Sequence, residues 1–413
     1  MILDIIIEEQ QGMLWVAATE RGTIESLEVD PVHELVRWGS IYWAKIERID
    51  SALDAAFLNL DGETTGILYN RDVRIRDKKG NLTKGGNQPI GKLLRAGDYI
   101  LVQAKQGYLE PEFEDNRKLE DKSPVVSMDV AIQGRYLIFT PLDDSNRISM
   151  RIRDKKLRKQ LEQMIEGLTD VQGCILRASA AHTQSDMLIR EAKILKAIWD
   201  GLSEHIGGTE ITLIMEGPDA LQRALSDNAD RQIRNIEVVI MEHFQTAEDW
   251  CELFAPDLIP KIKPIELKNA TTDLALFDHH DLIKPISQFF QPYIVLPGGG
   301  NIIVQSFAAL TAIDVNRGAD RNSHLQVNLE AAAEIARHIR IRNLGGAVLI
   351  DFISMKDEKD RKNLQEQFEN LVNDDPCTVQ IHGFTKLGFL EITRQRRTPT
   401  LDDRAGYMFE ESE

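Results

Sequence analysis

Short strand-like runs fill the first part of this 413-residue sequence, and strands alternate with helices in the last part. Residues 1–30 are typical of a strand meander with turns near 8–12 and 20–22. Turn-forming residues separate further short strands, expected at 41–49, 55–60, 66–69 and 99–104. Five or so short strands with a long loop at 76–91 predict a small Greek-key barrel, for which an OB fold is the usual candidate.

The pattern changes at residue 210 to short alternating strands and helices, and it is most regular after residue 281. There the sequence predicts strands at 293–296, 302–305, 310–315 and 347–353, and helices at 327–343 and 358–372. The order of meander, barrel and alternation indicates a barrel inserted into another domain. The predicted fold class is therefore an α+β multidomain protein.

The charge balance limits how this chain could bind nucleic acid. Lys plus Arg number 49 against 66 for Asp plus Glu, so the net charge is −17. This excludes a global electrostatic attraction for phosphate, and any nucleic-acid site must be a local basic patch.

The cysteines and the apolar runs predict a cytoplasmic protein. Cys174, Cys251 and Cys377 lie far apart, which excludes a disulfide framework and a cysteine-rich zinc site. No apolar run reaches the roughly 18 residues that a membrane-spanning helix needs. The first residues place an acid inside the apolar run and lack a basic flank, unlike a signal peptide.

Two aspartates follow apolar strand-like runs where another apolar residue would be ordinary. Asp314 follows Leu310–Ile313, and Asp351 follows 347–350. Asn316 projects from the same strand face as Asp314, because side chains alternate along a strand. Two carboxylates and an amide oxygen suit Mg²⁺, which could activate a water and neutralise phosphodiester charge. The alternative is that each aspartate caps its strand or pairs with an arginine of 337–342.

Several segments, in this order, resemble the catalytic block of the ribonuclease E/G family. They are Leu310-Thr311-Ala312-Ile313-Asp314-Val315-Asn316, Asn328-Leu329-Glu330-Ala331-Ala332, Glu334-Ile335-Ala336-Arg337, Leu344-Gly345-Gly346 and Ile350-Asp351-Phe352-Ile353. The resemblance extends to Gly39-Ser40-Ile41-Tyr42, Ala55-Ala56-Phe57, Gly134-Arg135-Tyr136-Leu137, Gly173-Cys174-Ile175-Leu176-Arg177 and the stretch 384–396. It therefore covers most of the chain.

The resemblance implies a fold of several domains. An RNase H-like domain would be divided between 1–35 and 210–280. An OB-fold RNA-binding domain (36–125) and a 5′-sensor-like domain (126–209) would be inserted into it. A DNase I-like catalytic domain (281–400) and a tail (401–413) would follow.

The implied activity is that of an endoribonuclease that cuts single-stranded RNA. Asp314 and Asp351 would bind Mg²⁺ with Asn316 in support, and water would attack phosphorus in line to leave 5′-phosphate products. The implied role is RNA processing or decay. Two alternatives remain open: an RNA-binding protein of the same fold with little or no cleavage, and, more weakly, a DNA nuclease that uses the same site.

The implied RNA contacts are Phe57, Lys122 and Arg177. Phe57 matches an aromatic that stacks a base, although a core phenylalanine of a barrel strand is the alternative, and Ile67 replaces a second expected aromatic. Lys122 would meet phosphate, or be a solvated loop lysine. Arg177 matches an arginine that binds a 5′-monophosphate, but Ala178 replaces the neighbouring threonine donor. Two outcomes stay open here: sensing of the RNA 5′ end survives this replacement, or it is weakened or lost.

Two further departures concern arginines and cysteines. The arginines at 394, 396 and 397 and those at 337, 340 and 342 could flank an RNA channel, or lie on solvated surfaces. No cysteine follows Arg397, whereas well-known family members carry a zinc-binding Cys-Pro-x-Cys motif there. We therefore predict no zinc site and no zinc-linked assembly, which leaves a monomer or a homodimer formed in another way.

Overall fold

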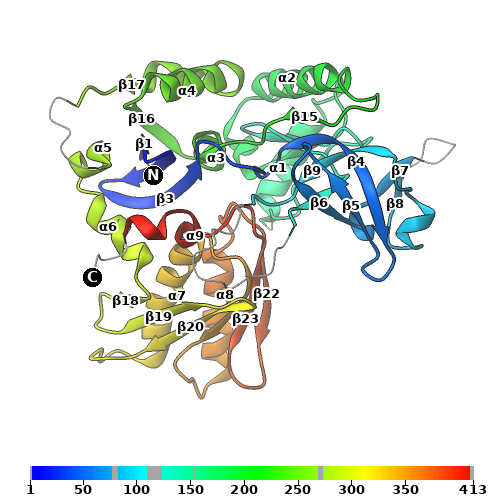
Figure 1. Ribbon diagram of the computed structural model, residues 1–413. Coiled ribbons are helices and arrows are strands. Elements are labelled where there is room, and N and C mark those ends of the chain that lie inside the picture. Colours follow the sequence, from blue (N-terminus) through cyan, green and yellow to red (C-terminus); the bar gives the residue numbers. More distant parts are fainter. Residues whose placement is uncertain (1, 77–81, 109–122, 153, 268–272, 410–413) are drawn as a thin grey trace. The chain divides into compact units, whose positions relative to one another are not determined.

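A computed structural model describes residues 2–76, 82–108, 123–152, 154–267 and 273–409. The chain divides into two compact units (Figure 1). The first unit comprises Met1–Pro31, Gln232–Gln245 and Lys261–Glu413, and the second comprises Val32–Arg231 and Thr246–Pro260. Most of the second unit thus enters the chain between two segments of the first.

A five-stranded sheet in the first unit joins the start of the chain to residues more than 200 positions later. Its strand order is β17-β16-β1-β2-β3. The bounds are β1 (Ile2–Gln10), β2 (Met13–Glu20), β3 (Thr23–Pro31), β16 (Gln232–Val238) and β17 (Ile262–Pro264). The pairing of β1 with β16 is parallel, whereas β1, β2 and β3 form an antiparallel meander.

Two-residue turns set the register of this meander. Gln11 and Gly12 join β1 to β2, and both have positive φ (51° and 72°). Positive φ at both central residues belongs to type I′ turns, whose twist matches that of the flanking strands. The short helices α5 (Ala275–His279), α6 (Ile283–Ser287) and α9 (Leu401–Ala405) add side chains to the core of this sheet.

A six-stranded sheet forms the other layer of the first unit, with the order β18-β19-β20-β21-β23-β22. The bounds are β18 (Tyr293–Val295), β19 (Asn301–Ser306), β20 (Leu310–Asn316), β21 (Gly346–Asp351), β22 (Val379–Phe384) and β23 (Leu390–Arg394). The neighbours β20 and β21 are parallel, and α7 (His324–Ile341) connects them.

Helices α7 and α8 (Glu358–Leu371) cover one face of this sheet (Figure 1). Alternate side chains of β20, including Ile313 and Val315, are buried against them, and Asp314 between them is exposed. Ser323 caps α7, because its hydroxyl accepts the backbone N–H of Gln326 at 3.3 Å. The helix therefore starts three residues earlier than the sequence pattern predicts.

The second unit contains a closed five-stranded barrel. Strands β4, β5, β6, β10 and β9 pair in that order, and pairing of β9 with β4 closes the ring. The bounds are β4 (Ile41–Asp50), β5 (Ala55–Asn59), β6 (Thr65–Tyr69), β9 (Tyr99–Ala104) and β10 (Val125–Ser127). The interior is apolar, with side chains such as Tyr42, Leu58 and Val102. This α+β fold with a closed barrel confirms the expectation of an OB-like domain.

A four-stranded sheet completes the second unit, in the order β11-β12-β14-β13. The bounds are β11 (Ile132–Gln133), β12 (Leu137–Phe139), β13 (Arg147–Ile148) and β14 (Cys174–Leu176). Smaller strands are β7 (Arg74–Arg76), β8 (Leu82–Lys84) and β15 (Thr212–Met215), the last of which pairs with β4. The helices are α1 (Lys155–Ile165), α2 (Ser185–Ser203) and α3 (Ala220–Asp227), while α4 (Met241–Phe254) has residues in both units.

Candidate functional site

The register of two parallel strands brings Asp314 and Asp351 together. The backbone positions of Asp314 on β20 and Asp351 on β21 are direct partners in the sheet. Neighbouring strands lie about 4.8 Å apart, so the two carboxyl groups leave the same face side by side. Both side chains are exposed, on the face opposite α7 and α8. The apolar runs before these aspartates suggest buried carboxylates, but because both side chains are exposed, the free-energy cost of desolvating them is small.

Asn316 belongs to the same cluster. Its side-chain amide nitrogen donates to Oδ2 of Asp314 at 2.7 Å. The carbonyl oxygen of this amide is then the atom that Asn316 can offer to a cation. The structure thus brings all three predicted residues of the candidate metal site together at the carboxyl ends of β20 and β21.

The electrostatics of the pair favour an added positive charge. Partial desolvation and then the negative charge of Asp314 raise the pKa of Asp351 above that of an ordinary aspartate. A divalent cation between the two carboxylates would relieve this repulsion. Two carboxylates and one amide oxygen are hard ligands of the kind that Mg²⁺ accepts together with water. The residues present therefore fit a magnesium ion, although no cluster of three or more His, Cys, Asp or Glu side chains suited to a metal occurs among the described residues.

The nearby arginines do not neutralise these aspartates in the structure. Arg337 and Arg340 on α7 donate to the backbone oxygens of Ile24 and Glu25 on β3. Arg342 donates to the His338 ring and to the backbone oxygen of Gln291. These contacts hold α7 within its own unit, and the alternative of arginine pairs for Asp314 and Asp351 finds no support in them.

Asn328 fixes the chain that follows Asp351, a role not predicted above. Its amide donates to the Ile353 backbone oxygen at 2.8 Å and accepts the Ile353 backbone N–H at 3.0 Å. The side chain is fully buried, at 0% exposure. A sequence signal existed, because Asn328 shares helical spacing with the core positions Ala331, Ala332 and Ile335 of α7.

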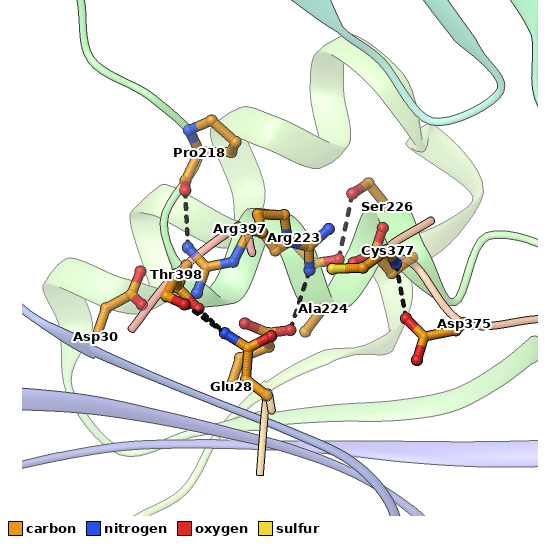
Figure 2. A network of polar contacts seen from close by, with 12 residues as sticks. Glu28, Asp30, Pro218, Arg223, Ala224, Ser226, Asp375, Cys377, Arg397 and Thr398 are labelled. Carbon is orange, nitrogen blue, oxygen red and sulfur yellow. Dashed lines mark hydrogen bonds and ion pairs between the residues drawn. The ribbon is translucent and has the colours of Figure 1, made fainter. Parts of the chain in front are cut away.

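The arginines at 394 and 397, at and just after the end of β23 in the six-stranded sheet, are largely structural. Arg394 is 3% exposed and forms a two-pronged ion pair with Asp375, so it is not available to RNA. Arg397 pairs with Glu28 at 3.1 Å, and Asp375 also accepts the Cys377 backbone N–H (Figure 2). Only Arg396 of this predicted basic run is exposed.

Phe57 lies on the outer face of the barrel rather than in its core. Its neighbours Ala56 and Leu58 point inward, and the Phe57 ring is partly exposed. The Arg48 guanidinium lies 3.6 Å from the ring centroid. Ile67, which stands where a second aromatic was expected, is the direct cross-strand partner of Phe57.

Arg177 is engaged inside the second unit. Its guanidinium donates to Asp227 at 3.0 Å and to the Gly134 backbone oxygen at 3.3 Å. A phosphate would have to compete with the Asp227 carboxylate for this guanidinium. The third predicted RNA contact, Lys122, lies outside the described residues.

Within the part of the chain that the structure describes, no helix combines the length and the apolar character needed to cross a bilayer. The cytoplasmic location stays a prediction.

Comparisons with known proteins identify the family of this chain. A model of the ribonuclease E/G family matches residues 131–397, which is more than half of the chain. Ribonuclease E of Haemophilus influenzae is 28% identical over 98% of this chain, which spans 43% of that relative. Ribonuclease G of Salmonella typhimurium is 26% identical over 97% of this chain, which spans 81% of it. The chain therefore belongs to the ribonuclease E/G family.

Proposed function

We propose that the protein is a Mg²⁺-dependent endoribonuclease that cleaves single-stranded RNA in RNA processing or decay. Family membership and the names of the relatives, ribonuclease E and ribonuclease G, support an enzyme that acts on RNA. The observation that carries the proposal is the cross-strand pairing of Asp314 with Asp351, with the Asn316 side chain hydrogen-bonded to Asp314.

The chain supplies ligands and orientation for this chemistry. Asp314 and Asp351 would hold the ion, and Asn316 would orient one carboxylate and offer its amide oxygen. When bound, Mg²⁺ lowers the pKa of a coordinated water and neutralises charge on the scissile phosphodiester. Attack of water on phosphorus with departure of the 3′ oxygen leaves a 5′-phosphate on the downstream product.

The finer architecture is part of the proposal. Residues 1–35 and 210–280 would form the RNase H-like domain, 126–209 the 5′-sensor-like domain and 281–400 the DNase I-like catalytic domain, with the OB-fold domain at 36–125. The meander joined to β16, the closed barrel and the sheet that carries the aspartates support this division.

The ion pair of Arg177 supports weak recognition of the RNA 5′ end. Asp227 already occupies the guanidinium, and Ala178 lacks a hydroxyl donor. Cleavage is therefore expected to depend little on whether the RNA carries a 5′-monophosphate. Phe57, which is partly exposed on the outer face of the barrel, would stack a base on the side of the ring that Arg48 does not cover.

The test uses a fluorescent, A/U-rich single-stranded RNA with Mg²⁺ or with EDTA. Internal cleavage that needs Mg²⁺ and disappears in Asp314→Asn and Asp351→Asn supports the proposal. The same RNA with a 5′-hydroxyl should be cut at nearly the same rate. Tight binding without cleavage would instead favour the second candidate, an RNA-binding protein of this fold. The replacement of an expected aromatic by Ile67 and of a threonine donor by Ala178 are the observations that favour this candidate.

A further inference from the structure

Strand alternation sorts the side chains of the barrel into an inner and an outer set. On β4, Tyr42, Ala44 and Ile46 belong to the apolar interior. Trp43 and Lys45, which alternate with them, therefore project outward. Both side chains are partly exposed.

Tyr99 on β9 joins this outer set. Its neighbour Ile100 points inward, and its backbone position pairs with that of Lys45. The Tyr99 ring stacks on Trp43, with centroids 6.4 Å apart and planes 23° apart. The Lys45 ammonium lies 5.9 Å from the Tyr99 centroid. An aromatic pair with a cation beside it therefore lies on the outer surface of the barrel.

A hydrogen bond holds the Trp43 side chain in place. Its indole N–H donates to the Gly208 backbone oxygen at 3.3 Å. Because the indole is anchored, the Tyr99 ring packs on a fixed plane rather than on a mobile side chain. A planar ligand that stacks on Tyr99 would then lose little further side-chain entropy.

The Tyr99 pair lies within reach of Phe57. On the other side of β4, Lys45 pairs with Asn59, which is two residues from Phe57 on the same face of β5. Two strand spacings across and one two-residue step along give roughly 12 Å between Phe57 and Tyr99. Four nucleotide steps span about 14 Å even at the duplex rise, and barrels of this kind bind four or more nucleotides.

We propose that Tyr99, backed by Trp43, is a second base-stacking position for single-stranded RNA, with Lys45 between it and Phe57 as a phosphate contact. This inference rests on the proposed function and names how the barrel holds that substrate. On the β6 side, Ile67 offers no ring next to Phe57, so the described aromatic surface continues across β4 toward β9. Bases would stack in turn on Phe57 and Tyr99.

The charges on this face favour stacking over phosphate contacts as the source of affinity. Arg48 covers Phe57 but also donates to Asp50 at 3.2 Å, and Glu47 accepts from Asn59 at 3.2 Å. These carboxylates offset much of the positive charge. Stacking is tolerant of sequence, because every base has a π-face.

The experiment measures binding of 5′-fluorescein-labelled oligouridylates of increasing length in EDTA by fluorescence anisotropy. Tyr99→Leu should weaken the binding of the longer oligomers roughly 5- to 150-fold, the loss expected for one stacked base. Tyr99→Phe keeps the ring and should bind like the wild type. The matched control is Tyr293→Leu, a similar change at an exposed tyrosine of β18, which should have no effect.

Two more variants sharpen the test. Phe57→Leu combined with Tyr99→Leu should give the product of the two single losses, since the rings would hold different bases. Lys45→Gln should lower the slope of log affinity against log salt by about 0.7, the value for one phosphate of a single strand.

The outcomes separate this inference from the proposed function. Wild-type binding by Tyr99→Leu, or equal losses in Tyr99→Leu and Tyr99→Phe with a lowered melting temperature, would overturn the second stacking position while cleavage persisted. A wild-type protein that neither bound oligouridylate nor cleaved RNA would overturn the proposed function itself.

Discussion

In the six-stranded sheet, three polar side chains converge through the register of two strands, whereas on the barrel, rings and cations are spread over three strands. The register of β20 and β21 is therefore tightly constrained. A shift of either strand by one residue would turn its polar side chains toward α7 and α8. On the barrel surface, Ile67 stands where a second aromatic residue is expected, and the aromatic Tyr99 lies on another strand, β9. In the proposed function, cleavage would thus depend on a few fixed groups, and RNA binding on a surface that tolerates substitution.

The sharpest separation of the two regions is Asp351→Asn. Loss of one ligand should lower the cleavage rate roughly a thousand-fold, since a bound cation is worth several kcal/mol to the transition state. RNA binding in EDTA should not change. The melting temperature should stay the same or rise slightly, because the repulsion between the two carboxylates is removed. Parallel rate, anisotropy and thermal-melt measurements check this, and an equal loss of binding would break the distinction.

Asp375→Asn tests a group that supports the sheet without touching substrate. Arg394 and Asp375 are both nearly inaccessible, and removal of one partner leaves a buried charge uncompensated. The free energy of unfolding should fall by about 3–5 kcal/mol. A urea titration measures it, with Asp374→Asn at the neighbouring exposed position as control. If stability is unchanged while RNA affinity falls, Arg394 would be a contact of RNA after all.

Asn328→Leu keeps the side-chain volume and leaves the Ile353 backbone N–H and oxygen without their partner. The expected loss is about 1–3 kcal/mol of stability. Because Ile353 follows Asp351 by two residues, kcat should fall while oligouridylate affinity stays constant. Time courses of cleavage at saturating RNA concentration measure kcat. A fall in affinity alone would contradict this positioning role.

The smallest effect concerns Glu191 in the second unit, which accepts the backbone N–H groups of Tyr136 and Leu137. Burial raises its pKa to about 7. The folded protein therefore binds a proton at Glu191 more readily than the unfolded chain does. The free energy of unfolding should increase as the pH falls through about 7 toward the pKa that Glu191 has in the unfolded chain. The melting temperature should thus rise by a few degrees as the pH is lowered from 8 to 6. Burial also raises the pKa of Glu34 to about 7, so Glu191→Gln should reduce this pH dependence and leave the part that Glu34 contributes. A variant with the same slope as the wild type would contradict the assignment.

Local sequence pattern predicted much of the fold. The meander, the short barrel strands and the helices α7 and α8 follow from turn residues and apolar spacing. The pairing of β1 with β16 could not be read from the pattern, because it joins positions more than 200 residues apart. Apolar spacing alone predicts that α7 starts at residue 327, whereas the Ser323 cap starts the helix at His324.

The candidate site was predictable in its residues but not in its environment. Asp314, Asn316 and Asp351 stood out as polar groups after apolar runs, yet their exposure depends on which sheet face the helices cover. The partners of Arg177 and Arg394 were not predictable either, since Asp227 and Asp375 approach through tertiary contacts. Asn328 could have been found as a polar residue at an apolar position of α7.

The most direct test of the central claim is a double-mutant cycle on cleavage in Mg²⁺. Rates are measured for the wild type, Asp314→Asn, Asp351→Asn and the double variant on the same single-stranded RNA. If both carboxylates hold one ion, the second substitution removes nothing further, and the double variant is no slower than the slower single variant. Multiplied losses, or cleavage that persists in the double variant, would contradict a shared metal site.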